Sequence, residues 1–264
     1  MVETIRRKEQ TYCVAINPEK VCFAHGDENF RKIVQKASFH ICDGAGTAAA
    51  VRILWGVKIP RITGIGLFLR MVATAEKEDL RVFLLGARPE VIQRTRLTLC
   101  ERHPRLRVAG CLHGYFQEDQ SQSVVEKINA ARADMLFVGL GSPKQERWIG
   151  QHRSRLDTPF CMGVGGSFDV LSGCAKRAPR VFQSTGTEWL YRLAKEPWRW
   201  RRQTALVGFA LSVLRQRVWS RQWATRVADA GAVRHDVVGD RPIPADIPSG
   251  EEQSLAGAVS TESR

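Results

Sequence analysis

The amino-acid sequence predicts an α/β fold in which helices flank a mainly parallel sheet. Short apolar runs rich in β-branched and aromatic residues alternate with helical patterns through residues 11–165, and glycine or proline marks many of the junctions. Regular alternation of this kind is typical of parallel sheets, because each crossover helix returns the chain to the same end of the sheet. The alternation ends near residue 175, where a basic, tryptophan-rich segment begins. The sequence therefore predicts an α/β domain followed by a helical, basic C-terminal appendage.

Six short runs are the expected strands: residues 11–16, 38–42, 81–86, 106–111, 134–141 and 159–165. Helical patterns cover residues 27–37, 46–56, 65–77, 89–102, 119–132 and 143–155. Ligands bind beyond the carboxyl ends of the strands in sheets of this kind. We therefore expect functional residues in the loops that follow the strands.

Composition and charge divide the chain of 264 residues into three parts. We expect an α/β domain over residues 1–175, a basic Trp- and Arg-rich appendage over 176–228, and a disordered tail over 229–264 that lacks any apolar period. The formal net charge is +13, and residues 176–226 hold twelve Lys and Arg against Glu188 and Glu196, a net of +10. A segment this basic predicts an anionic partner such as phospholipid, a phosphorylated substrate or nucleic acid.

The appendage contains an uncharged run, residues 204–214, with arginines on both sides and Trp219 and Trp223 nearby. Two interpretations stay open. The run suits a helix that lies in the headgroup region of a membrane, and it also suits a terminal helix packed on the domain with its arginines exposed. No apolar run approaches the roughly 20 residues of a membrane span, and we see no signal peptide. We therefore expect a cytoplasmic protein.

Asp43 follows the second expected strand and precedes Gly44, Gly46 and a helix. A carboxylate in this place can act as a general base, and the amides of the helix start can hold a phosphate or a sugar. A helix cap explains Asp43 equally well. The run from Gly44 also fits the G-x-G-x-x-A dinucleotide fingerprint. The acidic residue expected about 20 positions later is missing, however, and that region holds Arg61.

Three further segments combine glycine or tryptophan with charged residues. Residues 139–148 suit a nucleotide-binding turn or a capped helix start. Residues 163–173 bring two glycines close to Asp169, which is either a ligand contact or a turn former. Residues 188–202 contain arginines that either converge on a diphosphate or form a solvated basic face: Arg192, Arg199 and Arg202.

Metal and disulfide chemistry find no support in the sequence. No two histidines are spaced i, i+4, no HExxH is present, and none of the seven cysteines forms a CxxC pair. Zinc sites and disulfide frameworks use such spacings.

Short motifs occur in one order along residues 11–203. They are Asn17-Pro18-Glu19, Asp43-Gly44, Arg61-Ile62-Thr63-Gly64, Phe83-Leu84-Leu85-Gly86, Gly114-Tyr115-Phe116, Gly139-Leu140-Gly141 with Pro143-Lys144-Gln145-Glu146, Gly165-Gly166 with Phe168-Asp169, Arg177-Ala178-Pro179, and Glu188-Trp189-Leu190-Tyr191-Arg192-Leu193 with Glu196-Pro197. In these motifs the chain resembles the WecG/TagA/CpsF family, glycosyltransferase family 26.

The resemblance implies a Rossmann-like α/β domain with an appendage at the membrane. It also implies an inverting transfer of a sugar from a UDP-sugar to a polyprenyl-diphosphate-linked saccharide during synthesis of cell-surface polysaccharides. N-acetylmannosamine, its uronic acid, glucose and other hexoses all fit. The expected partners are the UDP-sugar, the lipid-linked acceptor and the anionic inner face of the cell membrane. No nucleic acid, cofactor or metal is expected, and a homo-oligomer is left open.

Roles for single residues follow from the same resemblance. Asp43 matches the family's proposed general base, and Arg61 and Gln145 match residues of the active-site pocket. Arg192, Arg199 and Arg202 match appendage arginines that close over the site, where they would offset charge on departing UDP. The other expected substrate-binding residues are Asn17, Gly44, Gly64, Gly139, Gly141, Lys144, Glu146, Gly165, Gly166, Asp169 and Arg177.

Three departures from the family pattern affect these expectations. Ala15 stands where the family usually has a threonine, so a hydroxyl is absent from the expected pocket. Gly66 stands where an aspartate is usual, which leaves the donor sugar open. Relatives also usually carry a strand and a helix before the first motif, so we expect a missing sheet edge or a start further upstream.

Two other functions fit parts of the sequence. The dinucleotide fingerprint would suit an NAD(P)-dependent oxidoreductase. The basic appendage would suit a non-catalytic module that binds lipid or nucleic acid, such as a degenerate transferase that has lost the threonine and the aspartate.

Overall fold

The computed structural model describes residues 1–176, 178–179, 182, 191, 193 and 206–218. The chain divides into two compact units, Met1–Leu214 and Arg215–Arg264. The predicted appendage lies largely outside the described residues and the predicted tail lies wholly outside them, so both boundaries stay predictions. The α/β architecture lies within the first unit.

Six strands form one sheet in which every pairing is parallel. They are β1 (Thr11–Ile16), β2 (Phe39–Cys42), β3 (Arg81–Gly86), β4 (Arg107–Leu112), β5 (Met135–Gly139) and β6 (Phe160–Gly163). Their order across the sheet is β2-β1-β6-β5-β3-β4, so β6 lies between β1 and β5. Each expected strand is present within a few residues of its predicted bounds, and the predicted fold class is confirmed.

Helices connect the strands. They are α1 (Val2–Arg6), α2 (Pro18–Gly26), α3 (Glu28–Gln35), α4 (Ala45–Trp55), α5 (Gly64–Lys77), α6 (Pro89–Arg102), α7 (Ser121–Ala130), α8 (Lys144–His152) and α9 (Ser167–Leu171), with short 3-10 turns η1 (Glu118–Gln120) and η2 (Arg153–Arg155). The six predicted helical segments are all present. Helices α1, α2 and α9 were not predicted. Among the described residues no strand precedes β1, and α1 occupies that stretch of the chain.

Helix α2 is stabilised by its first residues rather than by an apolar pattern. Pro18 occupies the first helical position, where a fixed φ and a missing N–H cost nothing. The side chain of Asn17 caps the helix by accepting a hydrogen bond of 2.9 Å from the Lys20 backbone N–H. The apolar residues of α2 do not gather on one face, which is why helical periodicity does not reveal it.

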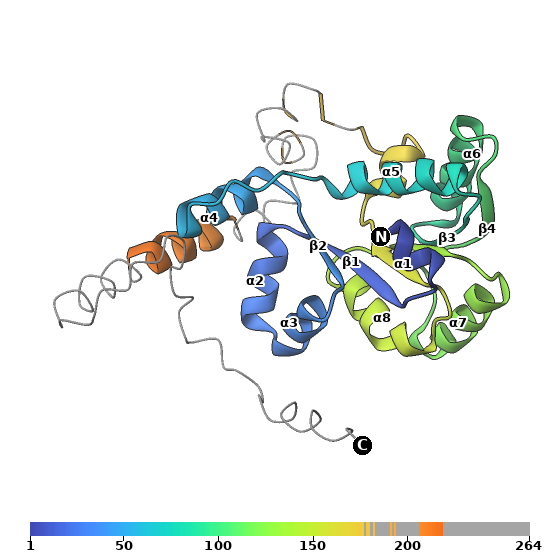
Figure 1. The fold of residues 1–264 in the computed structure, drawn as a ribbon, viewed down its shortest axis with the longest axis horizontal. Helices are drawn as coiled ribbons and strands as arrows, with labels where there is room; N and C mark the ends of the chain where they lie inside the picture. The colour runs from blue at the N-terminus through green and yellow to red at the C-terminus, as the bar shows by residue number, and fades with distance from the viewer. Residues whose placement is uncertain (177, 180–181, 183–190, 192, 194–205, 219–264) are drawn as a thin grey trace, which may run out of the picture. The chain divides into compact units, whose positions relative to one another are not determined.

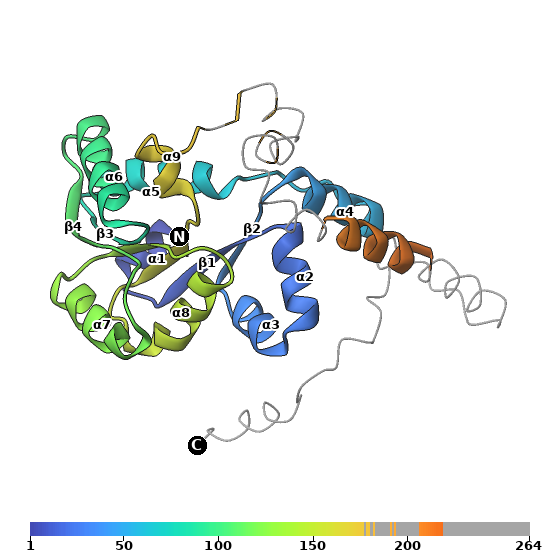
Figure 2. The same ribbon diagram turned by 180° about the vertical axis from the view of Figure 1, so that it is seen from behind.

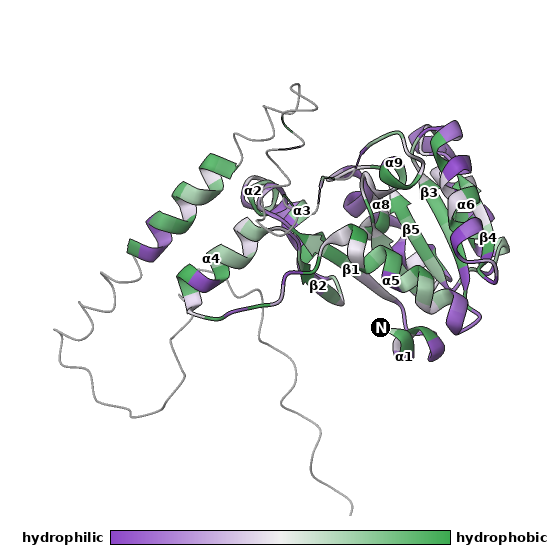
Figure 3. Cartoon of the chain, turned by 90° about the horizontal axis from the view of Figure 1, so that it is seen from above, coloured by the Kyte–Doolittle hydropathy of each residue, from purple (hydrophilic) through white to green (hydrophobic). Residues whose placement is uncertain are grey.

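Helices cover both faces of the sheet: Figures 1 and 2 show α5, α6 and α9 on one side, and α3, α7 and α8 on the other. On the first face, Phe68 of α5 contacts Phe137 of β5 and Phe168 of α9 edge to face, with ring centroids 4.7 and 5.8 Å apart. Trp148 of α8 packs in the core on the second face. Strands β3 and β5 are buried on both sides and are coloured as hydrophobic in Figure 3.

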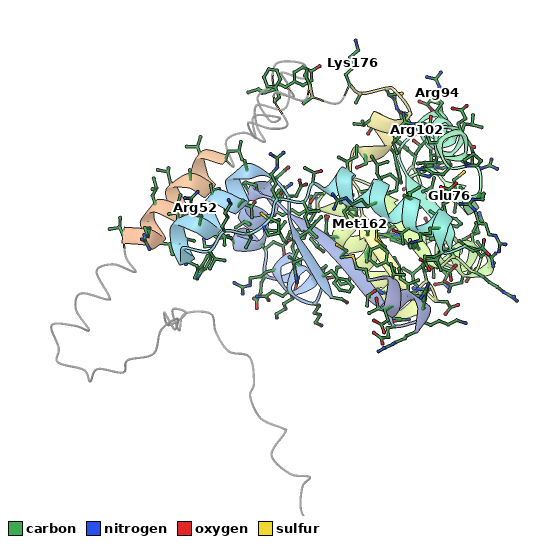
Figure 4. The ribbon with its side chains drawn as sticks, turned by 45° about the horizontal axis from the view of Figure 1, so that its top comes forward. Arg52, Glu76, Arg94, Arg102, Met162 and Lys176 are labelled. Atoms are coloured by element: carbon green, nitrogen blue, oxygen red, sulfur yellow. The ribbon has the colours of Figure 1, made fainter. Side chains whose placement is uncertain are left out.

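The middle of the sheet is fully enclosed. Met162 of β6 has no exposed surface and lies beneath α5 in Figure 4, whereas Arg94 and Arg102 are exposed on α6. Strands covered by helices on both faces read as continuous apolar runs in sequence. This explains why the four inner strands β1, β3, β5 and β6 were recognisable without any period-two alternation.

Residues 206–218 form a helix, in the region where the sequence predicts one. Phe209 and Val213 are buried with Ala50 of α4 in a small separate core. Positions on the opposite side of the helix carry exposed apolar side chains: Val207, Leu211 and Leu214. One face therefore packs on α4, and another stays open to solvent. No helix among the described residues has the length and apolar character needed to cross a membrane.

Candidate active site

The carboxyl ends of the six parallel strands lie along one edge of the sheet, and the predicted site residues follow them. Asp43 follows β2, and Asn17 follows the neighbouring strand β1. The Gly165–Gly166 turn comes after β6, and the segment 140–146 comes after β5. The topology therefore gathers segments that are far apart in sequence at one edge.

Asp43 is fixed at the end of β2 by its backbone. Its N–H donates to the carbonyl oxygen of Ile16 over 2.8 Å, which extends the β1–β2 pairing by one residue. Gly44, the next residue, has φ +98° and turns the chain into α4. Only glycine adopts that conformation readily. A Cβ atom added at Gly64 would lie 3.5 Å from Asp43 Oδ2, so the carboxylate points toward the start of α5.

Arg61 reaches the same end of β2 from the segment before α5. The N–H of Ile62 donates to the carbonyl oxygen of Cys42 over 3.0 Å, which holds this segment against the strand. Burial raises the pKa of the Cys42 thiol, the Asp43 carboxylate raises it further, and the Arg61 guanidinium lowers it. Both charges therefore act on one thiol, and the structure brings together Asp43, Arg61 and Gly64 as a local cluster.

Two of the three departures from the family pattern, Ala15 and Gly66, lie at this cluster. Ala15 is buried in β1, and its Cβ lies 3.6 Å from the position of a Cβ added at Gly64. A threonine hydroxyl at residue 15 would therefore sit beside Gly64 and Asp43. Gly66 lies in the first turn of α5, where its N–H donates to Thr63 Oγ1 over 3.2 Å. A Cβ at Gly66 would lie 2.7 Å from that oxygen, so an aspartate here requires the threonine cap to move.

A buried polar network lies beneath the middle of the edge. Gln145 Nε2 donates to Glu146 Oε1 over 2.8 Å, and Gln145 Oε1 accepts from the Gly165 N–H over 3.0 Å. Lys20 Nζ forms an ion pair of 2.8 Å with Glu146 Oε1 and donates to the Ala15 carbonyl oxygen over 2.9 Å. The side chains of Lys20 and Glu146 are only 6% and 2% exposed.

Sequence reasoning missed Lys20. A lysine is rarely buried unless it is paired. The residues near Lys20 in the sequence do not indicate that its partner is Glu146 on α8. The signal that could have found it is the Asn17-Pro18 helix start. Recognising α2 would have placed residue 20 in its first turn, beside the end of β1.

A pocket of about 670 Å³ opens at the other end of the edge, beyond β3 and β5. The residues that line it include Ala87, Gly114, Tyr115, Phe116, Gly139 and Lys144. Tyr115 is 69% exposed, and the Lys144 ammonium lies 5.8 Å from the centre of the Phe116 ring. The pocket thus offers aromatic faces and a positive charge, a combination that suits a planar, anionic ligand.

Several glycines that were predicted to bind substrate are also required at their positions by packing or by backbone conformation. A Cβ at Gly139 would lie 2.5 Å from the Phe168 ring, so this glycine is required by packing as well as by the pocket. Gly141 and Gly165 have φ values of +78° and +52°, which glycine adopts more readily than other residues. A Cβ at Gly166 would lie 3.7 Å from Asp169 Oδ2, and Asp169 lies in α9 close to the same turn.

The predicted arginines of the appendage lie outside the described residues: Arg177, Arg192, Arg199 and Arg202. Their roles therefore stay predictions.

Two of the cysteines are buried at the centre of the sheet. Burial raises the pKa of the Cys13 thiol to about 12 and that of Cys161 to about 11. Thiols of this kind are inert at neutral pH. Within the described part of the chain, no group of three or more His, Cys, Asp and Glu side chains could hold a metal ion.

The geometry at the edge suits a transferase: a carboxylate at one end, an aromatic and basic pocket at the other, and glycine-rich turns between them. Residues 1–223 match the model of the Glycosyl transferase WecG/TagA/CpsF family. The chain belongs to the WecG/TagA/CpsF family. Its members are glycosyltransferases of cell-surface polysaccharide biosynthesis, and this chain is one of them.

The run that starts at Gly44 resembles a dinucleotide-binding motif, but the strand order of this sheet differs from that of a dinucleotide-binding fold. In a dinucleotide fold, the required acid ends the strand that follows the glycine-rich turn and lies beside the first strand. Here β2 is an edge strand, and the next strand in sequence, β3, lies four places away across the sheet. The WecG/TagA/CpsF topology therefore does not provide the second half of that motif.

Proposed function

We propose that this protein transfers a sugar from a UDP-sugar to a polyprenyl-diphosphate-linked saccharide, with inversion at the anomeric carbon. The observation that carries the proposal is the placement of Asp43 and the pocket on one edge of the sheet. Asp43 follows β2, and Gly139 of the pocket ends β5, three strands away. With about 4.8 Å between neighbouring strands, this separation is roughly 14 Å, which suits an elongated nucleotide sugar lying along the edge.

In this arrangement the pocket takes the nucleotide. A volume of about 670 Å³ is in the range of pockets that enclose small ligands. Tyr115 offers a ring on which a base can stack, and the Lys144 ammonium suits the diphosphate. The sugar then extends past the Gly165–Gly166 turn toward Asp43.

Asp43 is the proposed general base. The acceptor hydroxyl gives its proton to the carboxylate, and its oxygen attacks the anomeric carbon from the face opposite UDP. The bond from that carbon to the diphosphate oxygen breaks, and UDP leaves with the electron pair. Arg61 lies beside this point, and Gln145 holds the neighbouring turn through Gly165.

Cationic side chains offset the charge on departing UDP in this proposal, without a bound metal. Lys144 lies at the pocket. Arg192, Arg199 and Arg202 would add to it from the appendage, together with Arg177 at the start of the same segment. Guanidinium groups suit this task because they bind phosphate through two parallel hydrogen bonds.

The lipid-linked acceptor requires access to a membrane surface, and we propose peripheral attachment to the anionic inner face. Exposed apolar side chains support it: Ile53 and Trp55 on α4, Val57 after it, and Val207, Leu211 and Leu214 on the helix at 206–218. The basic charge of residues 176–226 acts in the same direction.

A donor screen tests the proposal. The full chain is incubated with a panel of UDP-sugars and a polyprenyl-diphosphate-linked acceptor, with and without EDTA, and UDP release and glycolipid product are measured. We expect acceptor-dependent UDP release with one class of sugar, unchanged by EDTA and with inverted configuration in the product. Binding of anionic vesicles with no turnover for any donor would favour a non-catalytic lipid-binding module instead. Loss of turnover in EDTA that added metal restores would overturn the metal-independent step.

A further inference from the structure

The buried ion pair between Lys20 and Glu146 lies beneath the edge of the sheet that carries the proposed site, and neither residue lines the pocket. Lys20 comes from the first turn of α2, and Glu146 from the first turn of α8. The Nζ–Oε1 distance is 2.8 Å, and both side chains are almost fully enclosed. Burying two charges costs several kcal/mol of hydration for each ion, and the pair alone seldom repays it. A purely structural role could be filled by apolar residues, so the pair calls for another explanation.

The contacts around the pair lead to the Gly165 turn. Glu146 Oε1 accepts from both Lys20 Nζ and Gln145 Nε2, each over 2.8 Å. The opposite atom of the same amide, Gln145 Oε1, accepts from the Gly165 N–H over 3.0 Å. A carboxylate beside an ammonium only accepts, and a backbone N–H only donates, so the two ends of the Gln145 amide cannot exchange places. The charge of Lys20 thereby fixes which amide atom faces the turn.

The geometry leaves Gln145 little freedom to adapt if this anchor is lost. Its side chain is 2% exposed, and Gly163 of β6 makes room for it, because a Cβ there would lie 2.5 Å from Gln145 Nε2. Gly165 itself has φ +52°, a conformation that its hydrogen bond to Gln145 helps to hold. The Ala15 carbonyl oxygen, which accepts from Lys20 over 2.9 Å, ties the same network to the end of β1.

We infer that Lys20 is a positioning residue: acting through Glu146 and Gln145, it holds the Gly165 turn in the geometry that the sugar donor requires. Lys20 touches no substrate in this arrangement. It joins the turns after β1, β5 and β6, three neighbouring strands, into one rigid support. The inference rests on the proposed function, since it assigns the Gly165 turn to the donor.

The test compares Lys20→Met in the full chain with one double variant and one control variant. Lys20→Met keeps the length of the side chain but leaves the Glu146 carboxylate buried and unpaired, so it is combined with Glu146→Gln. The double variant removes both charges and keeps an acceptor for Gln145. Lys32→Met is the matched control, because the Lys32–Glu28 pair on α3 is exposed, with side chains 62% and 65% accessible.

Two readouts are measured: hydrogen exchange of the peptide that contains the Gly165 amide, and steady-state kinetics with the donor found in the screen. For Lys20→Met we expect faster exchange at Gly165 and a loss in kcat/KM for the donor of about 10- to 100-fold, the scale on which small misplacements act. The double variant should recover part of both, and Lys32→Met should change neither.

Unchanged exchange and unchanged kinetics in folded Lys20→Met would overturn the positioning role and leave the proposed function standing. Lower thermal stability with unchanged kcat and KM would also overturn it, because a merely structural pair behaves in that way. The third outcome is that the wild-type protein transfers no sugar while Lys20→Met exchanges faster at Gly165. That outcome would support the link from Lys20 to the turn and would overturn the proposed function instead.

Discussion

Asp43 Oδ2 lies against Gly64, the first residue of α5, at 3.5 Å from where a Cβ on that glycine would be. The first turn of α5 contains no acidic residue of its own. The amides at the start of a helix carry partial positive charge that favours a nearby anion. Helix α5 therefore supplies a favourable electrostatic environment for the Asp43 carboxylate, and Gly64 lets that carboxylate approach the helix.

Replacing Asp43 with Asn should remove the base and keep the shape of the site. We expect turnover with the lipid-linked acceptor to fall by about 10²- to 10⁴-fold, the usual contribution of a general base, with UDP affinity changed little. Kinetics and calorimetric titration with UDP measure the two effects. Asp79→Asn is the control, because Asp79 is exposed and has φ +57°, which Asn tolerates. An Asp43→Asn enzyme with wild-type turnover would exclude Asp43 as the base.

Replacing Tyr115 with Ala should weaken donor binding without loss of stability, since the side chain is 69% exposed. Stacking of a base on an aromatic ring contributes about 1–3 kcal/mol, so we expect the KM for the donor to rise by about 5- to 150-fold. Tyr115→Phe keeps the ring and should stay close to wild type. Equal KM values for the Ala and Phe variants would place the base elsewhere.

Replacing Gly139 with Ala should destabilise the domain. The new Cβ would lie 2.5 Å from the Phe168 ring, which is fully buried and has no space to yield. Overpacking of this kind costs about 1–3 kcal/mol, measurable as a lower free energy of unfolding in urea. Gly26→Ala in α2 meets no atom within 4 Å and should be neutral or stabilising by about 0.4–1 kcal/mol. A stable Gly139→Ala variant would contradict the packing described for this turn.

The contact between Glu76 and His103 predicts part of the response to acid. The His103 side chain, hydrogen-bonded at 2.8 Å, lowers the pKa of Glu76 below its ordinary value of 4.5, with a further hydrogen bond from the Arg105 N–H. A lowered pKa in the folded state means that the contact stabilises the fold above pH 4.5 and that this stabilisation is lost as pH falls through the folded-state pKa. Wild type should therefore lose more thermal stability than Glu76→Gln between pH 6 and roughly pH 3. Glu90→Gln, at an exposed position on the neighbouring helix α6, should follow wild type.

Replacing Leu211 with Asp should weaken attachment to membranes. This side chain is 62% exposed on the open face of the 206–218 helix. Burying a leucine contributes about 1.5–3 kcal/mol, so co-sedimentation with anionic vesicles should fall by about tenfold or more. Leu97→Asp is the matched control, because Leu97 is 59% exposed and lies on α6, far in sequence from the 206–218 helix. Equal losses for both variants would show that Leu211 has no special role at the membrane.

The strands and the position of Asp43 could be predicted because both depend on local sequence. Buried parallel strands read as apolar runs, and a carboxylate after such a run must lie at the carboxyl edge. Helix α2 was not predicted, because its start depends on Asn17 and Pro18 and its apolar residues do not follow one face. The partner of Lys20 was beyond prediction for a different reason: Glu146 lies 126 residues later, and only the insertion of β6 brings their elements together.

The position of β6 in the sheet also affects the order in which the strands can assemble while the chain is synthesised. Before β6 is synthesised, the chain contains two separate groups of strands. One group is β1 with β2, and the other is β3 with β4 and β5, because β1 and β5 do not pair with each other directly. Residues 160–163 close that gap, and they are the last strand of the described chain. A nascent chain shorter than this holds its carboxylate on one fragment and its aromatic pocket on another. The two halves of the proposed site therefore come together only after β6 has paired with both β1 and β5.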